Sequence, residues 1–130
     1  MKITALYAGL LALLFLVLSF RTILYRRAQR VEIGDGGDRE LLRRARVHAN
    51  FAEYVPLALL LMGLAESLGL PAIGLHVMGA VLLAGRLSHA WGLSQNPHLL
   101  QFRVAGVLAT TAVLFAGALA CVALSIVAMR

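Results

Sequence analysis

Residues 46–64 read RVHANFAEYVPLALLLMGL, so a polar string runs directly into an apolar stretch. An ionisable side chain at the centre of a membrane helix costs about 2.5–3.5 kcal/mol on insertion scales, and such groups usually face a bundle interior and serve a function. At 3.6 residues per turn, one side of a helix through this region carries Arg43, Arg46, Asn50 and Glu53. Tyr54 falls at the margin of that side and His48 nearly opposite. The pattern predicts a binding site within a membrane helix.

The chain as a whole is too apolar for a soluble domain of ordinary composition. It has 130 residues, 61% of them hydrophobic, and a mean hydropathy of +0.85. Four segments reach the roughly 20 apolar residues that a spanning helix needs. They run from about Ile3 to Leu24, Ala49 to Gly69, Pro71 to Leu93 and Leu100 to Met129. Since no alternating strand pattern occurs, helices are favoured over a barrel. We predict an all-α fold, a transmembrane four-helix bundle that forms a single domain over residues 1–130.

The connections between these segments carry cap and turn residues. Asp38 follows a glycine-rich break and is placed to cap a helix that begins near Arg39. Gly69 followed by Pro71 predicts a tight hairpin, and Asn96-Pro97 repeats the arrangement before the last helix. A stripe of small residues in that helix predicts close packing with its neighbours. The stripe consists of Ala105, Ala109, Ala112, Ala116 and Ala120.

The net charge of +6 is distributed unevenly along the chain. Most of the arginines lie between the first two spans, whereas the connection at residues 68–71 carries no base. By the positive-inside rule, the first and third connections face the cytoplasm. Anionic lipid headgroups are therefore expected partners, and a nucleic acid is not, because no soluble surface remains to bind one. Glu66 and His76, at the opposite hairpin, are expected to make structural interactions.

Polar side chains from all four spans gather in the predicted cytoplasmic half. They are Arg26, Arg27, Arg46, His48, Asn50, Glu53, Tyr54, Arg86, His89 and Arg103. Guanidinium groups bind carboxylates and a carboxylate receives an ammonium, so this set suits a small anionic ligand with one amine. The same cations would lower the pKa of a ligand thiol from about 8.5. No metal site is expected, because the histidines lack ligand spacing and Cys121 is the sole cysteine.

The run at residues 46–56 resembles the R-x-H/Q-x-N-x-x-E-x-x-P signature of the membrane-associated proteins in eicosanoid and glutathione metabolism, the MAPEG family. The likeness extends over residues 26–103 through Arg26-Arg27, Arg86, His89 and Arg103. It implies a homotrimer of left-handed four-helix bundles that holds glutathione between subunits near the cytoplasmic face. In such a trimer, His48 would face one subunit boundary while Asn50 and Glu53 face another.

The resemblance also implies a role for each matching residue. Glutathione would be bound by Arg26, Arg46, His48, Asn50, Glu53, Tyr54, Arg86 and His89. Arg103 would stabilise the thiolate and Arg27 would lie near the second substrate, so these two are the expected catalytic residues.

The chain departs from the members that act on lipid mediators, which have tyrosines where it has His89 and Leu93. It is closer to the small bacterial branch, which implies an integral, multi-pass protein of a bacterial inner membrane. The leading hypothesis is a glutathione-dependent transferase or peroxidase acting on hydrophobic electrophiles or hydroperoxides. One alternative is a glutathione-binding membrane protein without efficient catalysis. A small four-span multidrug transporter fits the size, but arginines around Glu53 would repel a cationic substrate.

Overall fold

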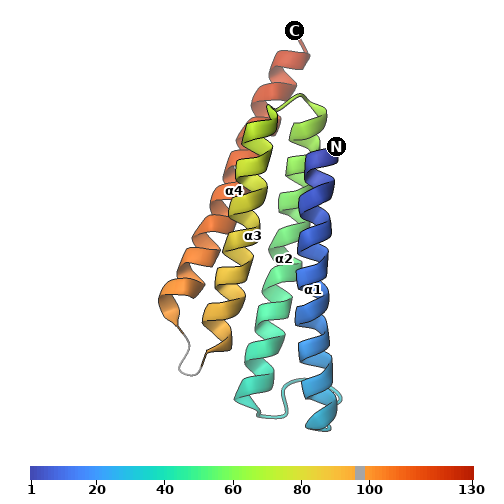
Figure 1. Ribbon diagram of the computed structural model, residues 1–130, viewed down its shortest axis with the longest axis vertical. Helices are drawn as coiled ribbons and strands as arrows, with labels where there is room; N and C mark the ends of the chain where they lie inside the picture. Colours follow the sequence, from blue (N-terminus) through green and yellow to red (C-terminus); the bar gives the residue numbers. More distant parts are fainter. Residues whose placement is uncertain (96–98) are drawn as a thin grey trace.

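The protein is an all-α bundle whose four helices run along its long axis (Figure 1). The computed structural model describes residues 1–95 and 99–130. The helices are α1 (Lys2–Ala28), α2 (Arg39–Ser67), α3 (Ala72–Ser94) and α4 (Leu100–Ala128). All four are long and apolar enough to cross a membrane, which confirms the predicted fold class. The predicted Asn96-Pro97 turn lies outside the described residues.

The start of α2 is fixed by the Asp38 side chain, as predicted. Its Oδ1 accepts hydrogen bonds from the backbone N–H groups of Glu40 (2.8 Å) and Leu41 (3.2 Å), and its Oδ2 accepts one from the Tyr25 hydroxyl (3.0 Å). These bonds satisfy donors that a helix leaves unpaired at its first turn. Donation by Leu41 above all holds the pKa of Asp38 below its usual range. The cap therefore joins the end of α1 to the start of α2.

The hairpin between α2 and α3 also forms as predicted. Gly69 has a φ of 89°, and its N–H donates to the Glu66 carbonyl while the Leu70 N–H donates to the Ala65 carbonyl. This is a Schellman motif, for which glycine suits the left-handed position, and Pro71 follows it. The two helices consequently run antiparallel.

Structural interactions tie α1 to this hairpin, which confirms the prediction for Glu66 and His76. The Glu66 carboxylate accepts hydrogen bonds from the backbone N–H groups of Ile3 (3.0 Å) and Thr4 (2.8 Å). It thus caps α1 from a distant part of the sequence. The Tyr7 hydroxyl lies 3.3 Å from Nδ1 of His76 and donates to its carbonyl oxygen.

Glycines bring α3 and α4 close together. A Cβ atom added at Gly106 would lie 2.6 Å from the Cβ of His89, and one added at Gly92 would lie 2.8 Å from the Arg103 nitrogen. No larger residue fits such a contact without displacing its neighbour. Of the predicted alanine stripe, Ala109 and Ala120 are half-buried in the single chain, whereas Ala105, Ala112 and Ala116 are exposed. The glycine contacts position His89 and Arg103 near one another.

The apolar core follows α2, with layers from the other helices packed around it. Its buried side chains are Leu11, Leu18, Val47, Phe51, Val55, Ala58, Met62, Met78, Leu82, Ala90 and Val113. The connection between α1 and α2 and the start of α4 lie at one end of the bundle, and the N-terminus lies at the other (Figure 1). The polar residues of the 46–56 signature begin near the end of the bundle that holds the connection between α1 and α2.

Candidate functional site

A cavity of about 250 Å³ opens where α2, α3 and α4 meet. It is lined by Leu42, Arg43, Arg46, Asn50, His89, Leu93 and Arg103. Four of these were predicted as site residues from sequence, namely Arg46, Asn50, His89 and Arg103. The four come from three helices, so the structure brings together residues that are far apart along the chain. Three of the lining side chains are arginines, so the cavity is strongly cationic and its charge suits an anionic ligand.

Asn50 is oriented in this cavity by Arg86, which lies behind it in α3. The Arg86 side chain is only 2% exposed, and its Nη2 donates a hydrogen bond of 2.9 Å to the Asn50 Oδ1. Its Nη1 lies 3.5 Å from the Thr110 Oγ1, and its guanidinium carbon lies 5.4 Å from the centre of the Phe51 ring. With its oxygen occupied, Asn50 offers its amide N–H groups to a ligand. Arg86 is thus a positioning residue, since it does not line the cavity.

His89 lines the cavity but is almost wholly buried. The residue is 3% exposed, and its Nδ1 is buried with no hydrogen-bond partner among the described residues. Buried polar atoms in proteins are nearly always hydrogen-bonded, so this nitrogen is an unusual feature next to the cavity. Arg103 is anchored opposite by its backbone, whose N–H donates to the Leu99 carbonyl over 3.3 Å. His89 and Arg103 thus line the same cavity from α3 and α4.

Other predicted site residues lie elsewhere in the single chain. The His48 Nε2 is 3.0 Å from the Ser19 Oγ, and its ring stacks on Phe15 with centroids 4.7 Å apart, so His48 faces α1. Arg26 donates to the Gly34 carbonyl over 2.7 Å and closes the turn after α1. Arg27 is exposed at the end of that helix.

Glu53 and Tyr54 are exposed on the surface of α2. Neither lines the cavity, and no acidic side chain does so among the described lining residues. An exposed carboxylate within a membrane span is costly. This face of α2 is therefore the part of the predicted site that a single chain leaves incomplete.

Arg43 also lines the cavity, and although the sequence placed it on the same side of α2 as the predicted site, it was assigned no ligand role. The signal was present in the sequence, because Arg43 precedes Arg46 by three residues and shares its side of α2. The signature alone does not include it. Leu93 also lines the cavity, at a position where sequence comparison indicated a missing hydroxyl.

Comparison with known proteins identifies the family of this chain. The model of the MAPEG family matches residues 4–123. The chain belongs to the MAPEG family. This MAPEG protein is 43% identical, over 108 residues, to inner membrane protein YecN of Escherichia coli strain K12, and the match covers 83% of this chain and 81% of YecN. The YecN of Escherichia coli O6:H1 matches equally well. With its four candidate spans, this MAPEG protein is a multi-pass protein of a bacterial inner membrane.

Proposed function

We propose that this MAPEG protein is a membrane-embedded, glutathione-dependent transferase or peroxidase that acts on hydrophobic electrophiles or hydroperoxides. The observation that carries the proposal is the cavity, where Arg43, Arg46 and Arg103 surround Asn50 and His89. Glutathione has two carboxylates for guanidinium groups to bind and a thiol for a cation to activate. Family membership supports the same ligand, because the family is generally glutathione-related.

The chemistry follows from the charges of the cavity. Arg46 binds a carboxylate of the tripeptide through paired hydrogen bonds, and Asn50 donates its amide N–H to the peptide. Arg103 stabilises the thiolate, which raises the fraction of nucleophile at neutral pH. The sulfur then attacks an electrophilic carbon, for example that of an aryl chloride, and the carbon–chlorine bond breaks to give a thioether and chloride. Alternatively it attacks a hydroperoxide oxygen, giving an alcohol and a sulfenic acid that a second glutathione converts to the disulfide and water.

The proposed assembly is a homotrimer with glutathione at the boundary between subunits. Glu53 and Tyr54 are exposed in the single chain at membrane depth, where an unpartnered carboxylate is unfavourable. A second copy packed on this face of α2 would cover both side chains and bring its own α1 arginines, Arg26 and Arg27, toward the cavity. Glu53 would then supply the carboxylate that the cavity lacks and receive the glutathione ammonium.

The test is the Arg103→Ala variant, purified and saturated with glutathione. We expect it to lose the ultraviolet absorbance of bound thiolate and at least about 10²-fold in turnover, the scale of loss seen when a group that stabilises developing charge is removed. Turnover is measured side by side with an aryl electrophile and an alkyl hydroperoxide. Arg39→Ala is the matched control, because Arg39 is an exposed arginine at the start of α2 outside the cavity lining. Unchanged thiolate and turnover in Arg103→Ala would exclude the role of Arg103.

A second candidate is a glutathione-binding protein without efficient chemistry. Leu93 favours it, because this apolar residue lines the cavity where catalytic relatives offer a tyrosine hydroxyl. Thermal stabilisation by glutathione, with no turnover of any electrophile or hydroperoxide, would establish this second function.

A further inference from the structure

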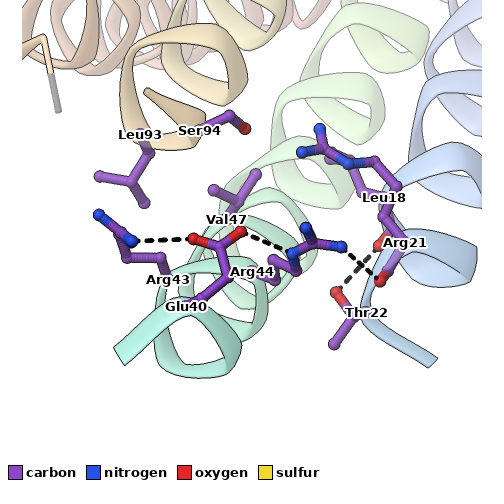
Figure 2. A pocket seen from close by; sticks show the side chains of 9 residues that line it. All are labelled: Leu18, Arg21, Thr22, Glu40, Arg43, Arg44, Val47, Leu93 and Ser94. Atoms are coloured by element: carbon purple, nitrogen blue, oxygen red, sulfur yellow. Dashed lines mark hydrogen bonds and ion pairs between the residues drawn. The ribbon is translucent and has the colours of Figure 1, made fainter. Parts of the chain in front are cut away.

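Arg43 lines two neighbouring hollows, and Glu40 is its ion-pair partner beside the smaller one. One hollow is the 250 Å³ cavity described above. The other lies between the ends of α1, α2 and α3, is lined in part by Glu40, Arg43 and Arg44, and measures about 10 Å³ (Figure 2). A volume of this size is about the least that holds one water, so the second hollow has no room for a ligand. This second hollow matters because the ion pair between Glu40 and Arg43 lies beside it.

Glu40 binds two guanidinium groups at once. Its Oε2 lies 2.9 Å from the Arg43 Nη2, and its Oε1 lies 2.7 Å from the Arg44 Nε, so the carboxylate lies between the two arginines (Figure 2). Arg44 is fixed further by a hydrogen bond of 3.3 Å from its Nη1 to the Arg21 carbonyl. Its guanidinium carbon also lies 4.2 Å from the centre of the Tyr25 ring. Glu40 therefore keeps a well-anchored cationic partner even when Arg43 turns away.

The ligand cavity, in contrast, has an excess of positive charge. Arg43, Arg46 and Arg103 line it, and its described lining contains no carboxylate to offset them. Like charges around one space repel one another, and an anion entering it removes that repulsion. A ligand carboxylate would thus compete with Glu40 for Arg43. The exchange costs little, because Arg44 continues to neutralise Glu40.

We propose that Arg43 is a further specificity-determining residue, which binds a carboxylate of glutathione, and that Glu40 is the resident counter-ion that the ligand displaces. The inference rests on the proposed function and extends it to a residue outside the family signature. Glu40 would then weaken ligand binding by competing for Arg43, although Glu40 lies outside the ligand cavity. Arg44, by holding Glu40, favours the release of Arg43.

The test is the affinity for glutathione, measured by titration calorimetry on the purified membrane protein and three variants. Arg43→Gln should weaken binding by about tenfold, the scale expected for losing a hydrogen bond to a charged group. Glu40→Gln should strengthen binding, because the competing carboxylate is gone. Arg44→Gln should weaken it, because Glu40 then pairs with Arg43 alone. Arg39→Gln, which removes an exposed arginine outside both hollows, should leave the affinity unchanged.

Glu40→Gln and Arg44→Gln should thus change the affinity for glutathione in opposite directions. If the ion pairs were merely structural, both variants would change the affinity in the same direction. The double variant Glu40→Gln with Arg43→Gln should bind as weakly as Arg43→Gln alone, because Glu40 acts only through Arg43. Arg43→Lys keeps the charge and the fold and should still bind more weakly, because lysine lacks the planar fork. If the wild-type protein binds glutathione and Arg43→Gln binds it equally well, this inference is wrong and the proposed function stands. A wild-type protein that binds no glutathione overturns both.

Discussion

Arg86 is a buried cation whose neighbours in the described part of the chain are neutral. Its hydrogen-bond partners are Asn50 and Thr110, and the Phe51 ring lies beside it. Burying a guanidinium without a carboxylate is costly, so the arrangement is expected where a function requires it. The hydrogen bond to Asn50 supplies that function, because it decides which atoms of the amide face the cavity.

We expect Arg86→Met to weaken glutathione binding by about tenfold, since the amide of Asn50 loses the charged donor that orients it. The methionine side chain fills much of the same volume, so the helical circular dichroism should persist. Thr110→Ala is the control, because the Thr110 hydroxyl is the more distant partner, at 3.5 Å, and should change affinity little. Equal affinities for Arg86→Met and the wild type would show that Asn50 needs no orientation by Arg86.

Residue spacing could predict part of the site and not the rest. Arg46 and Asn50 are four residues apart on one helix, so their shared side follows from helical periodicity alone. The meeting of His89 with Arg103 depends on the close approach of α3 and α4, which single-helix patterns do not encode. Within the chain His48 contacts Ser19 of α1, a neighbour that the spacing along α2 does not predict. The neighbour that a helix face meets is a property of the tertiary fold.

At the scale of the element, the helix ends were the most predictable feature. Asp38 and the Gly69-Pro71 pair are local signals, and both act where predicted. The predicted apolar span ends at about Leu24, whereas α1 continues for one more turn to Ala28. Arg26 and Arg27 occupy that last turn, where arginine has a high helix propensity and its charge complements the helix dipole. Hydropathy detects the apolar span and not its polar continuation.

The Asp38 cap makes stability depend on pH. Its pKa is held below the ordinary value of 3.8, chiefly by the hydrogen bond from the Leu41 N–H. A carboxylate with a lowered folded-state pKa stabilises the fold above its ordinary pKa and loses this contribution as the pH falls through the lowered value. Asp38→Asn still accepts the capping bonds but carries no charge. We expect its melting temperature to fall less than that of the wild type between pH values of about 5 and 3. Parallel falls in the two proteins would contradict the assignment.

The glycine contact between α3 and α4 is the element-scale feature that forms the site. Gly106→Ala would place a methyl carbon 2.6 Å from the His89 Cβ, so the helices must separate. Overpacking of this kind costs about 1–3 kcal/mol in the free energy of unfolding, and it should also weaken ligand binding. Gly9→Ala in α1 is the matched control, because its methyl would meet nothing within 4 Å. In thermal unfolding, Gly9→Ala should match or exceed the wild type, and a Gly106→Ala variant that did the same would refute the close packing.

At the scale of the whole molecule, the charged connection and the ligand cavity lie at the same end of the bundle, while Glu66 and His76 tie the other end together. The positive-inside rule predicts that the end with the cavity faces the cytoplasm. Composition predicted the four candidate spans, because a spanning helix needs about 20 mostly apolar residues. Glu53 and Tyr54 face outward from the single chain, and in the proposed trimer they would contact a neighbouring copy.

In the proposed function, Arg46, Asn50, His89 and Arg103 converge on glutathione at a boundary between copies of this chain. The most direct measurement is an experimental structure of the purified protein in lipid nanodiscs with saturating glutathione. We predict three subunits, with one glutathione in each cavity, its thiol beside Arg103 and Glu53 covered by a neighbouring copy. Glutathione bound away from these four residues, or cavities that stay without glutathione at saturation, would contradict the account.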